Sequence, residues 1–134
     1  MTRRTIHTED APAAIGPYVQ AVGVTATEMV FCSGQIPFDP KTMELVEGGE
    51  GNVEVQTEQV MKNMEAVLTA AGCSFADVVR TTIFIKNMDD FAKINAVYAT
   101  RFPGDKPARA CVEVARLPKD VLVEIDAIAT KRAP

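Results

Sequence analysis

The segment from Pro107 to Ile125 holds the residues whose types and spacing best suit chemistry on a small molecule. Arg109, Cys111 and Glu113 alternate along a stretch that we expect to be a strand, and alternation in a strand puts all three on one face. Arginine is a good partner for a carboxylate because its planar guanidinium donates two parallel hydrogen bonds. The segment therefore predicts a binding site for a small substrate that carries a carboxylate.

Glu124 is the second group of this segment with a chemical use. We expect residues 108–114 and 121–130 to pair as an antiparallel hairpin across the turn LPKD. Symmetric pairing places Glu124 opposite Glu113 and on the same face as Arg109, with the backbones of Arg109 and Glu124 roughly 13 Å apart. The gap suits a small molecule, and the glutamate could act as general base or hold a water. A slip of one residue in the register would move Glu124 to the other face.

Each of these residues also has a purely structural interpretation. An arginine and a glutamate on neighbouring strands, such as Arg109 and Glu124, commonly form a structural ion pair. Cys111 by itself is more typical of a small buried hydrophobic residue than of a nucleophile. The residue types alone leave both interpretations open.

Other kinds of catalytic chemistry have little support in the sequence. The single histidine, His7, lies in a polar segment near the N-terminus, and a Ser-His-Asp triad or a Cys-His pair would have to use it. Cys32, Cys73 and Cys111 are far apart and form no C-x-x-C motif. We therefore expect no disulfide framework, no metal site and reduced thiols.

Composition and charge narrow the class of protein. The 134 residues, 47% apolar and 24% charged, fit one globular domain that spans residues 1–134. A net charge of −4 argues against nucleic acid as a partner, because nucleic-acid binding favours a basic face. No apolar run approaches the roughly 20 residues of a membrane span, and no signal peptide is visible at the N-terminus. We expect a cytoplasmic protein.

Two segments have the periodicity of amphipathic helices. Between Val53 and Ala71, apolar residues recur at i, i+4, i+7, i+8 and i+11, and Gly72 follows as the expected C-cap. The second helix can be capped by Asn87 or Asp89, and Pro103-Gly104 ends it. Its apolar face consists of Phe91, Ile94, Tyr98 and Phe102.

Runs of β-branched and apolar residues predict the strands. They cover residues 19–24 and 29–33 on either side of the turn TATE, then 78–86, 108–114 and 121–130. The order β-β-α-β-α-β-β predicts an α+β fold in which two helices cover one face of a single mixed sheet. Because the other face also carries apolar side chains, we expect a homo-oligomer that buries it.

The segment around Arg109 resembles the signature of the RidA (YjgF) family of enamine/imine deaminases. That signature pairs a Pro-Ala-Arg run with a downstream apolar-Glu-Ile run, here Pro107-Ala108-Arg109 and Val123-Glu124-Ile125, with Val112 and Ala115 between them. The resemblance covers nearly the whole chain. Its further matches are Ala14-Ile15-Gly16-Pro17-Tyr18, Ser33-Gly34-Gln35-Ile36-Pro37, Gln56-Thr57 with Asn63, and Ile94-Asn95-Ala96-Val97-Tyr98.

The resemblance implies a chorismate-mutase-like α+β fold and a homotrimer with sites at the subunit interfaces. It also implies hydrolysis of 2-aminoacrylate and 2-iminobutyrate to 2-keto acids and ammonia, without cofactor or metal. The chain departs from the family in a longer loop, residues 44–52, to which we assign no role. The trimer agrees with the second apolar sheet face expected above.

Roles for individual residues follow from the same resemblance. Arg109 would bind the substrate carboxylate, Cys111 would contribute its backbone groups near the substrate nitrogen, and Glu124 would position the attacking water. Further pocket positions of the family match Tyr18, Ser33, Gly34 and Asn95. Structural alternatives for these remain: a turn glycine, a surface asparagine and a packing tyrosine.

Two other functions compete with deamination. Cleavage of RNA, an activity ascribed to some relatives, would need phosphate contacts that a net charge of −4 with one peripheral histidine disfavours. A sensor or chaperone-like protein could bind a small carboxylate in the same pocket without turning it over. Glu124 favours catalysis, because simple binding gains nothing from a carboxylate beside the substrate carboxylate.

Overall fold

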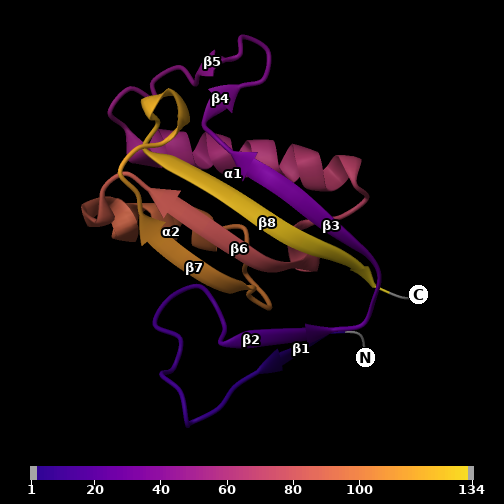
Figure 1. Cartoon of the computed structure of the whole chain (residues 1–134). Helices are drawn as coiled ribbons and strands as arrows, with labels where there is room; N and C mark the ends of the chain where they lie inside the picture. Colours follow the sequence, from indigo (N-terminus) through magenta and orange to yellow (C-terminus); the bar gives the residue numbers. More distant parts are fainter. Residues whose placement is uncertain (1–2, 133–134) are drawn as a thin grey trace.

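A mixed sheet of four strands with two helices on one face forms the body of the protein (Figure 1). The computed structural model describes residues 3–132. The elements are β1 (Arg3–Ile6), β2 (Ala21–Val24), β3 (Ala26–Gln35), β4 (Phe38–Asp39), β5 (Glu44–Leu45), α1 (Val53–Ala70), η1 (Phe75–Asp77), β6 (Val78–Ile85), η2 (Met88–Asp90), α2 (Phe91–Ala99), β7 (Ala108–Glu113), η3 (Pro118–Asp120) and β8 (Val123–Arg132).

The strands of the main sheet lie in the order β3-β8-β6-β7. β8 is antiparallel to both β3 and β6, whereas β7 is parallel to β6 because α2 connects them as a crossover. Two short hairpins, β1-β2 and β4-β5, stand outside this sheet. The expected α+β fold, with a mixed sheet and two helices on one face, is confirmed.

α1 begins and ends as its sequence predicts. The side chain of Asn52 accepts a hydrogen bond from the backbone N–H of Val55, which caps the N-terminus. At the other end Gly72 has a φ of 76°, and the N–H of Cys73 donates to the carbonyl of Leu68. This is a Schellman ending, which uses a left-handed residue that glycine adopts without steric cost. The expected helix and its glycine cap are confirmed.

The core lies between the helices and the sheet. In Figure 1 both helices run behind the strands, and their apolar faces meet the inward side chains of β6 and β8. On α2 the residues Ile94 and Tyr98 are fully buried, as the periodicity predicts, and Phe102 is buried just beyond its end. Asn87 caps the short turn η2 that leads into α2 by accepting from the N–H of Asp89. α2 itself has Asp90 at its N-cap without a side-chain capping hydrogen bond, so Asn87 caps the preceding turn, and neither Asn87 nor Asp89 caps α2 directly.

The hairpin expected between residues 108–114 and 121–130 is wrong. β6 lies between β7 and β8, so Arg109 faces Thr81 of β6 and Glu124 faces Phe84 of β6. The expected turn at LPKD is present, with a positive φ at Lys119 and Asp120. It connects β7 to β8 on the far side of β6, and not to a strand directly beside β7. The local sequence pattern predicts such a turn, but it does not show whether another strand lies between the two strands that the turn connects.

Two details of the N-terminal third also differ from expectation. The strand expected at 19–24 is β2, which pairs with β1 and not with β3, and Arg3–Ile6 was not predicted as a strand. The small β4-β5 hairpin, which lies between β3 and α1, was also not predicted. These strands are short, and their pairing depends on contacts distant in the sequence.

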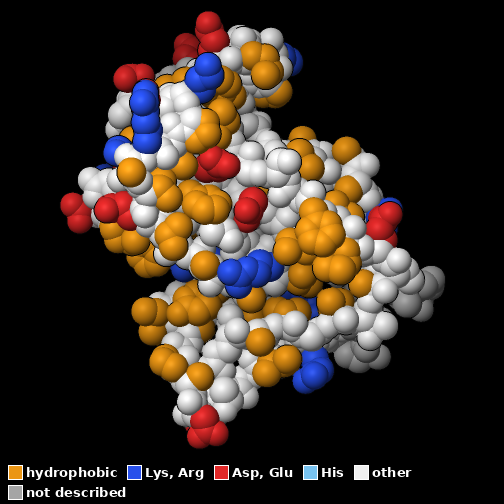
Figure 2. All heavy atoms as spheres, viewed as in Figure 1, with side chains coloured by type: hydrophobic (Ala, Val, Ile, Leu, Met, Phe, Trp, Pro, Cys, Tyr) orange, Lys and Arg blue, Asp and Glu red, His pale blue; other side chains and the backbone are white. Residues whose placement is uncertain are grey.

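The sheet face opposite the helices exposes apolar side chains. Phe31 is 71% exposed and Met29 56%, and Val112 on β7 is also exposed. Figure 2, which looks onto the strands from the side away from the helices, shows hydrophobic and acidic side chains together on this face. Large exposed apolar patches commonly mark contact surfaces. Within residues 3–132, none of the helices has the length and apolar character to cross a membrane.

We expect Met64→Ala on α1 to lower the free energy of unfolding by about 2–5 kcal/mol, because it opens a cavity in the core. Met64 is 2% exposed. The matched control is Met43→Ala, at a methionine that is 69% exposed, and it should change stability by no more than about 0.5 kcal/mol. Urea denaturation measures both, and equal losses in the two variants would contradict this description of the core.

Glu58 on α1 should stabilise the fold in a pH-dependent way. Its carboxylate accepts hydrogen bonds from Arg101, just after α2, and this bond lowers the pKa of Glu58. A lowered pKa in the folded state contributes stability above the unfolded pKa, and this is lost as the pH falls. Glu58→Gln should therefore be less stable than wild type at neutral pH, and the difference should shrink in acid.

Urea denaturation at a series of pH values measures that difference. Glu65→Gln, at an exposed position of the same helix, is the matched control and should show no such trend. A gap between wild type and Glu58→Gln that stays constant down to acid pH would show that the ion pair is not its cause.

Candidate active site

Arg109 lies on the helix side of β7, within a group of aromatic rings. Its guanidinium carbon is 5.2 Å from the ring centre of Tyr18, 5.2 Å from that of Tyr98 and 5.6 Å from that of Phe91. One guanidinium nitrogen donates to the side-chain oxygen of Asn95 at 2.6 Å. Cation–π contacts and a single amide partner hold the group in place without neutralising its charge. The guanidinium keeps donors available for an anion.

The spacing of α2 explains why these side chains meet. Phe91, Asn95 and Tyr98 fall at i, i+4 and i+7, so they share the helix face that lies over β7. The hydroxyl of Tyr98 is 2.8 Å from the hydroxyl of Thr81, the β6 residue beside Arg109. Burial raises the pKa of Tyr98 to about 12, so this phenol stays neutral and braces the arginine.

Tyr18 reaches the site from the irregular N-terminal segment. Its neighbour Val19 forms a parallel bridge to Ala108 at the start of β7. The Tyr18 hydroxyl accepts a hydrogen bond from the N–H of Ile15, which closes a tight turn around Gly16. A Cβ at Gly16 would lie 3.3 Å from the Arg109 guanidinium, a tight contact. The segment therefore packs closely against the arginine.

These residues enclose a depression at the edge of the sheet. Its volume is about 250 Å³, enough for a small organic acid, and it is mainly apolar apart from the arginine. The residues that line it are Ile15, Tyr18, Met88, Phe91, Arg109 and Cys111. Such a pocket fits a ligand with one carboxylate and a short apolar body.

Cys111 lies in this depression as a thiol. Burial raises its pKa, and the positive charge of Arg109 only partly offsets that rise. A raised pKa keeps the sulfur protonated at neutral pH, and the protonated form is a poor nucleophile. The side chain therefore acts as a wall of the pocket, and its backbone groups are the polar groups it can offer.

Glu124 lies on the opposite face of the sheet. It pairs with Phe84, whose side chain points away from the helices, while Arg109 pairs with the inward-facing Thr81. The expectation that Arg109, Cys111 and Glu124 share one face is therefore wrong within one chain. The inserted strand β6 changed the register, and a change of one residue reverses the face of a side chain.

Gly34 and Ser33 accompany Glu124. Between Cys32 and Gln35 the pairing of β3 with β8 is interrupted by a bulge that contains Ser33 and Gly34. A Cβ at Gly34 would lie 2.0 Å from a carboxylate oxygen of Glu124, so only glycine leaves room for this side chain. Burial, followed by the nearby charge of Asp126, raises the pKa of Glu124. A raised pKa suits a carboxyl group that exchanges protons near neutrality.

The predicted site residues thus form two groups. Tyr18, Asn95 and Cys111 surround Arg109, whereas Ser33 and Gly34 lie beside Glu124 on the other face; we call these the arginine group and the glutamate group. Sequence reasoning missed Met88, Phe91 and Tyr98 as members of the arginine group. The helix periodicity that marked Phe91 and Tyr98 as core residues also puts Asn95 on the same face, and this could have found them.

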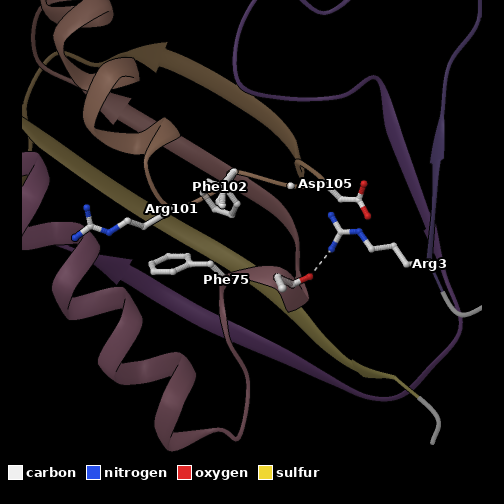
Figure 3. A pocket seen from close by; sticks show the side chains of 8 residues that line it. Arg3, Phe75, Arg101, Phe102 and Asp105 are labelled. Carbon is white, nitrogen blue, oxygen red and sulfur yellow. Dashed lines mark hydrogen bonds between the residues drawn. The ribbon is translucent and has the colours of Figure 1, made fainter.

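A second hollow of about 180 Å³ lies on another side of the molecule (Figure 3). The guanidinium of Arg3 donates to the backbone carbonyls of Ala76 and Val78, and Arg101 points away toward Glu58. Phe75 and Phe102 form its apolar floor, with their ring centres 5.4 Å apart. These contacts fasten β1 to the start of β6. The hollow is a structural junction.

The fold and the site describe an α+β domain with a small, mainly apolar pocket beside a half-buried arginine on the edge strand β7, Arg109. Comparison with known proteins gives the family. The family profile described as "Endoribonuclease L-PSP" matches residues 8–131. The chain belongs to this family, which is also known as the YjgF/RidA family. The resemblance inferred from the sequence motifs is confirmed.

Individual relatives are similar over nearly their full length. A RutC family protein of Synechocystis is 55% identical over 130 residues, covering 96% of this chain and 97% of its own. The 2-iminobutanoate/2-iminopropanoate deaminase of Salmonella typhimurium is 52% identical over 132 residues, with 96% and 98% covered. The crystal structure of Escherichia coli TdcF with bound serine has a TM-score of 0.72 and 46% identity, with 96% and 98% covered.

The three thiols should react slowly with iodoacetamide at neutral pH, because burial raises the pKa of each of them. Cys111 should react first, since Cys32 and Cys73 are buried and Cys111 only half-buried. Its rate should rise with pH through the alkaline range. Mass spectrometry of peptides measures the modification, with glutathione as the reference thiol. Faster reaction of Cys111 than of glutathione at neutral pH would identify an activated nucleophile instead.

Proposed function

We propose that the protein hydrolyses 2-imino acids and their enamine forms, such as 2-iminobutyrate and 2-aminoacrylate, to 2-keto acids and ammonia. The observation that carries the proposal is Arg109, charged, caged by aromatic rings and open to a small apolar pocket. Full-length similarity to relatives named 2-iminobutanoate/2-iminopropanoate deaminase supports it. The reaction class is hydrolysis of a carbon–nitrogen bond.

The chemistry requires little beyond positioning. An imine carbon is already electrophilic, so the protein needs to anchor the carboxylate, polarise the nitrogen and place a water. Arg109 binds the carboxylate, and backbone groups at Cys111 lie along the same strand near the nitrogen. Water adds to the imine carbon and gives a carbinolamine. Its nitrogen then takes up a proton and the carbon–nitrogen bond breaks to release ammonia. The hydroxyl loses its proton as the carbonyl of the keto acid forms.

Glu124 is the group we assign to the water. As a carboxylate it accepts a proton from the attacking water, and it can return that proton to the departing nitrogen. Its raised pKa brings it closer to neutrality, where both transfers are efficient. In one chain, however, Glu124 and Arg109 lie on opposite faces of the sheet.

A second copy of the chain would bring an arginine group and a glutamate group together at one site. The glutamate group of one copy can complete the arginine group of the next, and the exposed apolar side chains Met29 and Phe31 on the glutamate face gain a partner. Because the two groups lie on different faces, each copy uses one face toward one neighbour and the other face toward another. Contacts of this head-to-tail kind form a ring when the rotation between copies closes. We propose a ring of three copies, the homotrimer with three shared sites that the family resemblance implies.

Two alternative functions, an endoribonuclease and a sensor or chaperone-like protein, fit the candidate site less well than a deaminase does. An endoribonuclease, the activity in the family profile's description, would need a basic surface for phosphates, and the net charge is −4. A sensor or chaperone-like protein would bind a carboxylate without needing Glu124 or the space that Gly34 leaves for it. Release of keto acid from an imine separates catalysis from both.

Arg109→Ala should lower kcat/KM for 2-iminobutyrate by about 30- to 1000-fold, because loss of the bidentate partner costs about 2–4 kcal/mol. The measurement is keto-acid release above the spontaneous rate from imine generated in situ. Arg116→Ala is the control, since Arg116 is an exposed arginine paired with Asp120 outside the pocket. Activity of Arg109→Ala equal to that of Arg116→Ala would refute the role of the arginine.

Mixing two inactive variants tests the shared site. Arg109→Ala retains Glu124, and Glu124→Ala retains Arg109, so ring oligomers assembled from equal amounts should recover about a quarter of wild-type activity. Each variant alone should stay inactive, and sedimentation should show the same oligomer throughout. A mixture that remains inactive despite forming mixed oligomers would place both residues in one chain's site.

A further inference from the structure

The pocket around Arg109 is lined along β7 by Arg109 and Cys111. Arg109, Cys111 and Glu113 point to the same side of β7, and successive members of this row are about 7 Å apart. A 2-imino acid laid along this row with its carboxylate at Arg109 would have its reacting carbon near Cys111 and its side chain toward Glu113.

Met88 lines the pocket and lies beside Glu113, at that end of the row. Its side chain is large, apolar and 41% exposed. Two of the other lining residues, Tyr18 and Phe91, pack their rings against the guanidinium of Arg109. Ile15 also lines the pocket, and its N–H donates to the hydroxyl of Tyr18.

Glu113 fixes the position of Met88. Its carboxylate accepts a hydrogen bond of 2.8 Å from the backbone N–H of Met88. Asn87 accepts from Asp89 in the same turn, so the backbone on either side of Met88 is anchored. The strand that carries Arg109 therefore also holds the residue at the far end of the pocket.

We propose that Met88, positioned by Glu113, limits the length of the substrate side chain that the pocket accepts. The inference rests on the proposed function and concerns which residue of this pocket distinguishes 2-imino acids by the length of their side chains. A flexible thioether chain forms a compliant wall, which packs against a short side chain and obstructs a longer one. Met88 is a specificity residue, and Glu113 is a positioning residue that acts through it.

The test compares two imines made in situ by oxidation of the parent amino acids, 2-aminobutyrate with a short side chain and norleucine with a longer one. The readout is the ratio of kcat/KM for the long imine to kcat/KM for the short one. Met88→Ala should raise this ratio about tenfold, since one to two methylenes in an apolar pocket carry that much discrimination. The change should appear mainly in KM for the long imine.

Matched variants isolate the cause. Met88→Leu keeps an apolar wall and should keep the wild-type ratio, as should Met43→Ala, an exposed methionine outside this pocket. Glu113→Gln retains a hydrogen-bond acceptor for the N–H of Met88 and should keep the wild-type ratio. Glu113→Ala releases the turn and should raise the ratio in the same direction as Met88→Ala, by a smaller factor.

An unchanged ratio in Met88→Ala, with wild-type activity on the short imine, would overturn this inference and leave the proposed function standing. An equal or larger rise in Ile15→Ala would assign the wall to Ile15 and overturn it as well. A wild-type protein that accelerates neither imine would overturn the proposed function and this inference together. A wild-type ratio in Glu113→Ala would remove the positioning role from Glu113.

Discussion

The insertion of β6 between β7 and β8 is the constraint on which the rest of this structure depends. It pairs Arg109 with Thr81 and Glu124 with Phe84, and these two positions on β6 point to opposite faces of the sheet. In one chain the arginine group and the glutamate group therefore lie on opposite faces of the sheet. The face away from the helices also exposes the apolar side chains of Met29 and Phe31, so burial of that face and the proposed shared site favour the same kind of assembly.

Within one copy, the arginine group is organised in advance of any ligand. Asn95 accepts one hydrogen bond from Arg109, and three aromatic rings surround the guanidinium without supplying a counter-charge. An arginine with no carboxylate partner in the pocket keeps its affinity for an external carboxylate. The glutamate group depends on the β-bulge at Ser33 and Gly34, where the absence of a Cβ on Gly34 leaves space for the carboxylate of Glu124. Both groups therefore depend on backbone geometry as much as on side-chain identity.

Much of the fold was predictable because its signals are local. The helix at Val53–Ala70, its glycine ending and the apolar face of α2 all follow from periodicity and capping, which involve residues within a few positions of one another. The main strands were found for the same reason. The pairing of β7 with β6 rather than β8, and of β2 with β1, was not, because adjacency in a sheet is decided by contacts distant in the sequence.

The candidate site was likewise only partly predictable from the sequence. The residue types can be read from the sequence alone: an arginine suited to a carboxylate, a glutamate suited to a water, and motifs that identify the family. Which of these residues lie together depends on the packing of the strands. The tertiary structure brought Tyr18, Asn95 and Met88 to Arg109, and it placed Glu124 on the other face. The physical reason is the pleat of the sheet, in which one residue of register reverses the direction of a side chain, and register is set by the neighbouring strand.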